Sequence, residues 1–87
     1  MSRDRFLADQ SLAVGDAWVE RVKRDLRRDN REAMGGWPGT LREARARAAA
    51  HFTADALTAG ELEHVVHRIY DQARAKWLAF ARSDPTA

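Results

Sequence analysis

Apolar residues recur every three or four positions in three segments of the chain, and no segment alternates as a β-strand does. The pattern is strongest in the last third, in the residues Leu62, Val66, Ile69, Ala73, Trp77 and Phe80. Thr58 and Glu61 stand three residues apart just before it, which is the spacing of a capping box at a helix start. The sequence therefore predicts a helix over residues 59–82.

Two further helices are predicted upstream. One apolar stripe follows Asp16, a good N-cap residue, and predicts a helix over 16–34. Its residues are Trp18, Val19, Val22 and Leu26. Thr40 and Glu43 repeat the capping-box spacing and predict a shorter helix over 41–54, whose apolar stripe is narrow and mostly alanine.

Residues 35–40 separate the first two helices. They contain three glycines and one proline, so a regular element cannot continue through them. Trp37 lies in the middle of this turn and belongs to no apolar stripe. Two interpretations follow: Trp37 closes the open end of a helical bundle, or it is an anchor at a protein interface, a role in which tryptophan is enriched.

The sequence predicts the secondary structure of the two chain ends less precisely than that of the three helices. Gly15 favours a break before the first long helix, which makes residues 1–14 a short helix capped by Ser2 or a mobile arm. A continuous extension of the following helix is the remaining alternative. Residues 83–87 are predicted to be a flexible tail. The whole chain is then a single all-α domain, a small antiparallel three-helix bundle over residues 1–87.

Composition narrows the class of protein. The chain has 87 residues, of which 45% are hydrophobic and 32% charged. It is too apolar for a disordered tail and too charged for a membrane span. It contains no cysteine, which excludes disulfides and fits a reducing cytoplasm. Thirteen arginines against two lysines, with many alanines, favour a GC-rich bacterial genome, so we expect a cytoplasmic bacterial protein.

Charge is distributed unevenly although the net charge is only +2. Residues 21–47 carry nine Arg or Lys against four Asp or Glu, whereas residues 48–73 carry one arginine against four acidic residues. We therefore expect an electrically polarised molecule.

Catalysis is not expected. No serine, threonine or histidine set has the pattern of a nucleophile with its base, no glycine loop has the context of a phosphate-binding motif, and the core is too small to enclose a substrate. The leading hypothesis is a non-catalytic adaptor, accessory subunit or inhibitor without a cofactor. It would dock on a protein partner, with an acidic partner and self-association as open alternatives. The predicted protein-binding residues are Trp37, Arg28, Arg31, Arg42, Arg45 and Leu78, the last because it projects from the charged side of the third helix.

Nucleic-acid binding is the second hypothesis. Arginines spaced three and four residues apart share one face of the first helix, and further arginines follow the turn. Such a row of guanidinium groups can contact successive phosphate groups along a nucleic-acid backbone. The residues are Arg21, Arg24, Arg27, Arg28, Arg31, Arg45 and Arg47. A solvated face with helical ion pairs is the simpler interpretation. A helix-turn-helix reader is rejected because Glu61 and Glu63 would face DNA phosphates.

A metal-binding bundle is the third hypothesis. Its weak candidate ligands, Glu61, His64, His67 and Asp71, spread over one side of the third helix. Di-metal bundles take a Glu-x-x-His motif from each of two helices. This chain has one such motif, on the face opposite the apolar stripe, so exposed histidines are the simpler interpretation.

Overall fold

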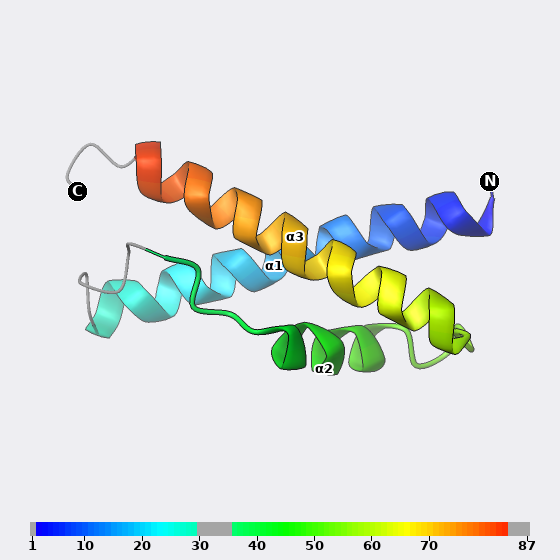
Figure 1. The fold of residues 1–87 in the computed structure, drawn as a ribbon. Helices are drawn as coiled ribbons and strands as arrows, with labels where there is room; N and C mark the ends of the chain where they lie inside the picture. The colour runs from blue at the N-terminus through cyan, green and yellow to red at the C-terminus, as the bar shows by residue number, and fades with distance from the viewer. Residues whose placement is uncertain (1, 30–35, 84–87) are drawn as a thin grey trace.

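The computed structural model describes residues 2–29 and 36–83. This part of the chain contains three helices and no strand: α1 (Arg3–Asp29), α2 (Leu41–His51) and α3 (Ala59–Ser83). They pack against one another as a small bundle (Figure 1), which confirms the predicted all-α three-helix architecture.

Consecutive helices run in opposite directions, so α1 and α3 are parallel to each other (Figure 1). Arg3 at the start of α1 contacts Glu61 at the start of α3, and Lys23 near the other end of α1 lies over the ring of Phe80. α2 returns between these ends, and its last residue, His51, contacts Gln10 of α1. The helix α3 packs against both other helices, whereas α1 and α2 meet only sparsely.

The predicted break at Gly15 is wrong, because α1 continues through it as one helix. Gly15 is buried where α1 crosses α3. A Cβ atom at this position would lie 3.0 Å from the Ile69 carbonyl oxygen and 3.0 Å from Cβ of Gln72. The glycine therefore permits a close approach of two helices at a cost in helix propensity of about 1 kcal/mol.

The predicted arm or separate short helix over residues 1–14 is wrong for the same reason, and Asp16 is not an N-cap. Ser2 caps the real start: its Oγ accepts a hydrogen bond from the Arg5 backbone N–H at 3.2 Å. The Arg3 guanidinium donates to both carboxylate oxygens of Glu61, at 2.6 and 3.0 Å, and to the Asp55 carbonyl at 3.0 Å. The start of α1 is thus bonded to the start of α3.

Both predicted capping boxes are present. Thr40 Oγ1 accepts from the Glu43 N–H, and the Glu43 carboxylate accepts from the Thr40 N–H, each at 3.1 Å. Thr58 and Glu61 make the same reciprocal pair at 3.0 and 3.1 Å. These caps place the starts of α2 and α3 where the sequence predicts them.

The helix ends differ more from the predictions. α2 ends at His51 rather than at residue 54, and Ala56 in the following loop has a φ of 50°. α3 ends at Ser83, one residue later than predicted. The predicted extension of the first helix over 30–34 and the tail over 84–87 lie outside the described residues.

The core is built around tryptophan. Its largest fully buried side chains are Trp18, Trp77, Ile69, Val19 and Val66. Trp37 is partly buried and packs against this core, edge-on to Trp18 with ring centroids 4.9 Å apart and 5.9 Å from Trp77. This is the contact that the bundle-closing interpretation predicts; the interface-anchor role stays a prediction.

Gly39 completes the contact between the turn and the core. A Cβ atom at Gly39 would lie 2.5 Å from a ring atom of Trp37 and 2.6 Å from one of Trp18. Gly36, in the same turn, has no atom within 4 Å of such a position. The two glycines therefore have different roles, although their sequence context is similar.

We predict that Gly39→Ala destabilises the fold by about 1–3 kcal/mol, because overpacking must displace one of two tryptophan rings. Gly36→Ala is the matched control and should change stability by less than about 0.5 kcal/mol. Urea unfolding followed by circular dichroism measures both. Equal stability of the two variants would contradict the packing of the turn.

We predict that acid weakens the ion pair between Arg3 of α1 and Glu61 of α3. Hydrogen bonds from Arg3 and the Thr58 backbone hold the pKa of Glu61 at about 2, below its ordinary value of 4.5. A carboxyl group with a lowered pKa stabilises the fold above its ordinary pKa, and this stabilisation is lost as the pH falls towards 2. The effect is modest because the pair is exposed to solvent.

Arg3→Gln should therefore lower the urea midpoint at neutral pH, and the difference from the unmodified protein should shrink near pH 2. Arg5→Gln, in the same turn of α1, is the control and should leave the midpoint unchanged at both pH values. A difference for Arg3→Gln that does not vary with pH would contradict the role of the Glu61 charge.

Candidate functional site

A groove follows the sparse contact between α1 and α2. Its volume is about 540 Å³. α1 contributes Ala13, Val14, Ala17, Trp18, Arg21 and Arg24, and α2 contributes Arg47, Ala50 and His51. The α1 residues share one face because they recur at helical spacing. The groove is thus lined by the two Ala- and Arg-rich helices and not by α3.

The floor of the groove is apolar and made of small side chains. Ala13, Ala17 and Ala50 are exposed, and Val14 is half-buried. Trp18 lies beneath them and is only 1% exposed, so it supports the floor without offering a free ring face. Small residues leave room for another element to approach the backbones of α1 and α2 closely.

Arginines border this floor. Arg21 and Arg24 are exposed, and neither has an acidic partner within ion-pair distance among the described residues. The Arg47 guanidinium stacks over the Trp18 ring at 4.9 Å. Its Nε is buried and finds no hydrogen-bond acceptor in the part of the chain that the structure describes. The rim of the groove therefore carries positive charge that the described part of the chain does not neutralise.

This arrangement differs from the predicted ion-paired helix face. Glu20, four residues before Arg24, pairs instead with Lys23 at 3.1 Å. Lys23 also lies over the Phe80 ring at 4.4 Å, so its side chain belongs to the contact with α3. Arg21 and Arg24 are left to face the groove.

The predicted nucleic-acid residues divide into three groups. Arg21, Arg24 and Arg47 line the groove. Arg45 belongs to the contact between α2 and α3, where it hydrogen-bonds Glu63. This bond raises the pKa of Arg45 and lowers that of Glu63. The side chains of Arg27, Arg28 and Arg31 lie outside the described residues.

The predicted protein-binding residues that the structure describes lie in different surroundings. Arg42 is exposed in the first turn of α2, whereas Arg45 faces α3. Trp37 packs on the core. The expectation that Leu78 is exposed is wrong: it is partly buried and packs against the hydrophobic core.

Sequence reasoning missed the alanines and His51 as groove residues. Alanine is a strong helix former, and nothing local in the sequence separates an exposed alanine on a groove from one on a solvated face. The available signal is the row of Ala13, Ala17 and Arg21, four residues apart on one helix face. His51 lies at the end of the groove, where its Nε2 is 2.8 Å from Oε1 of Gln10.

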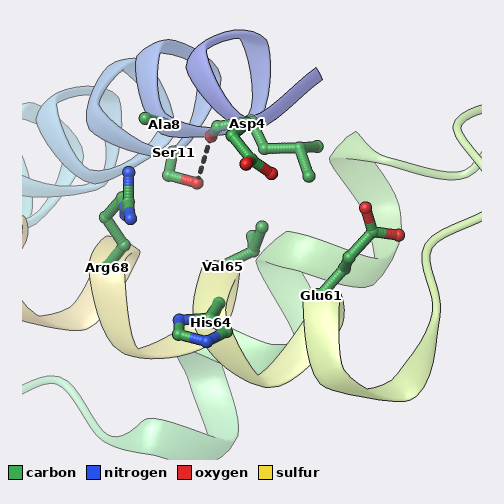
Figure 2. A pocket seen from close by; sticks show the side chains of 8 residues that line it. Asp4, Ala8, Ser11, Glu61, His64, Val65 and Arg68 are labelled. Atoms are coloured by element: carbon green, nitrogen blue, oxygen red, sulfur yellow. Dashed lines mark hydrogen bonds between the residues drawn. The ribbon is translucent and has the colours of Figure 1, made fainter. Parts of the chain in front are cut away.

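The weak metal candidates are not assembled as a ligand set. Both Glu61 oxygens accept from Arg3, and His67 is 3.9 Å from Glu63. Within the described ranges, no group of three histidine or acidic side chains is arranged to hold a metal ion. Glu61 and His64 instead line a second hollow, between α1 and α3, with a volume of about 300 Å³ (Figure 2).

Comparisons with protein-family models, with curated proteins and with solved structures find no match to this chain. None of the described helices has the length and apolar character needed to cross a membrane.

Proposed function

We propose that this chain is a small non-catalytic interaction protein that binds an acidic, amphipathic helix of a partner protein in the groove between α1 and α2. The observation that carries the proposal is the combination of an apolar, small-residue floor with an arginine rim that has no acidic partner among the described residues.

The shape of the groove suits a helix. Ala13 and Arg24 mark its ends on α1, and the eleven helical steps between them rise about 16 Å, or three turns. Helices whose contacts are small side chains pack with axes about 8–10 Å apart. A bound helix would bury its apolar stripe on the floor, as in other helix-in-groove complexes.

The charge of the groove suits an acidic helix. Aspartate and glutamate flanking the bound apolar stripe would make charge-assisted hydrogen bonds to Arg21 and Arg24. Arg47 is already ordered by its stack on Trp18, so less side-chain entropy is lost when it binds a carboxylate.

Nucleic acid is the weaker candidate for the same groove. Single strands usually bind by stacking bases on exposed aromatic rings, and Trp18 is covered by Arg47 and almost fully buried. The floor of the groove is apolar, which favours binding of the apolar stripe of a helix over binding of the phosphate backbone of a nucleic acid.

Catalysis is not part of the proposal. The Ser11 hydroxyl is buried and donates to the Leu7 carbonyl at 2.6 Å. Thr40 and Thr58 are used as helix caps. These hydroxyl groups therefore have structural duties.

We predict that a fluorescein-labelled helical peptide of about four turns, with a leucine and alanine stripe flanked by glutamates, binds the protein in anisotropy titrations. Arg21→Gln combined with Arg24→Gln should weaken binding about tenfold or more, because two charged contacts are lost. Ala17→Leu should block binding by filling the floor. Arg74→Gln, on the exposed side of α3, is the matched control.

Three further ligands decide between the candidates. A peptide of the same composition with its stripe scrambled should not bind, and neither should a labelled DNA duplex or single strand. Tight, salt-sensitive binding of DNA without binding of the amphipathic peptide would replace the proposal with nucleic-acid binding. Failure of all four ligands to bind would overturn the groove as a docking site.

A further inference from the structure

We infer that Phe6 of α1 is an anchor for the partner helix beyond the end of the groove, so that the partner is a longer helix with its apolar and acidic residues in opposite halves. The inference rests on the proposed function, because it takes the groove between α1 and α2 as the seat of that helix. It adds the length of the partner helix, the distribution of its charges and one further contact residue.

Phe6 is a large apolar side chain at the surface of the bundle. It lies in the second turn of α1, is 36% exposed, and is not one of the residues that form the hydrophobic core or pack against it. Its ring makes no contact with another aromatic ring or with a cation among the described residues. Single exposed apolar residues are common on proteins, so the position of the ring decides what it can do.

The ring lies in line with the floor of the groove. Seven residues of helix turn about 20° short of two full turns, so Phe6 and Ala13 project from the same side of α1. Ala17 follows one turn later. Gln10, between Phe6 and Ala13, contacts His51 at the end of α2, so this side of α1 faces α2. Phe6 therefore continues the apolar floor about 10 Å beyond Ala13.

The positive charge of α1 in the groove is confined to the opposite end. Arg21 and Arg24 lie about 12 and 16 Å further along α1 than Ala13. Both are exposed and have no acidic partner within ion-pair distance among the described residues. Between Phe6 and these arginines, the side of α1 that faces α2 carries Gln10, Ala13 and Ala17, which are uncharged. One end of the extended surface is thus apolar and the other is basic.

A helix that matches this surface has its acidic residues in one half only. The eighteen helical steps from Phe6 to Arg24 rise about 27 Å, or five turns, against three turns for the groove alone. One half of the partner would carry glutamates or aspartates that bind Arg21 and Arg24. The other half would carry leucine and methionine around a small residue, so that they enclose the phenyl ring.

Acidic residues in both halves would fit this surface less well. Carboxylates placed over Phe6 would lose hydration and find no basic group to replace it. The segregation of charge along the partner helix is therefore the feature that the extended surface selects.

The test uses three fluorescein-labelled helical peptides of about six turns and identical composition, in anisotropy titrations of the full chain. Two of them hold leucine and methionine in one half and glutamate in the other, in the two opposite orders. In the third, the same residues are spread evenly along the helix. The tighter-binding of the two segregated peptides should bind about tenfold more tightly than the third, because it buries the Phe6 ring without desolvating a carboxylate.

Variants of the protein assign this advantage to the ring. Phe6→Ala should remove it, and should leave binding of the four-turn peptide unchanged, since the groove itself is kept. Leu12→Ala is the matched control. Leu12 is 40% exposed on the same helix, but lies about 120° around α1 from Phe6 and lines a shallow hollow against α3 with His64 and Gln72. Its replacement should change neither titration.

Two results would overturn the inference and leave the proposed function in place. One is that the segregated peptides bind no more tightly than the evenly spread one, and the other is an advantage that survives Phe6→Ala. If neither the four-turn nor the six-turn peptides bind, the proposed function fails and this extension fails with it. A dimer of the free protein that Phe6→Ala dissociates in sedimentation equilibrium would assign the ring to a second copy of the chain, and would also overturn the inference.

Discussion

The close crossing of α1 and α3 at Gly15 is the constraint on which the rest of the structure depends. Without a Cβ atom at this point, α1 passes within contact distance of the Ile69 carbonyl and the Gln72 side chain. Beyond the crossing, α1 stays attached to α3 on both sides, through Arg3 and Glu61 at one end and through Lys23 and Phe80 at the other. One long parallel pair, rather than three equal helices, is therefore the frame of the molecule.

One face of α1 is open because α2 covers it only sparsely. α2 is short, and the two helix residues that it buries completely are alanines, Ala44 and Ala48. Its arginines divide by side: Arg45 faces α3 and pairs with Glu63, while Arg47 faces α1 and covers Trp18. Because α2 meets α1 only sparsely, the positive side of α1 stays accessible as a groove.

Local signals in the sequence predict local structure well. The caps at Thr40 and Thr58 and the apolar stripe of α3 depend on neighbours a few residues away, so they can be recognised from spacing alone. The role of Gly15 cannot be recognised from spacing, because it permits a contact with α3, more than fifty residues away in the sequence. The candidate site was predictable only in part. The arginine row of α1 follows from periodicity, but the separate fates of Arg45 and Arg47 depend on how α2 is rotated against its neighbours.

The most direct test of the crossing is a set of NOEs from the two Gly15 Hα protons in the labelled full chain. The account predicts strong NOEs to the β and γ protons of Gln72, together with helical chemical shifts that run without interruption from Arg3 through Gly15. Absence of these NOEs, with non-helical shifts around Gly15, would contradict the crossing and restore a break in the first helix.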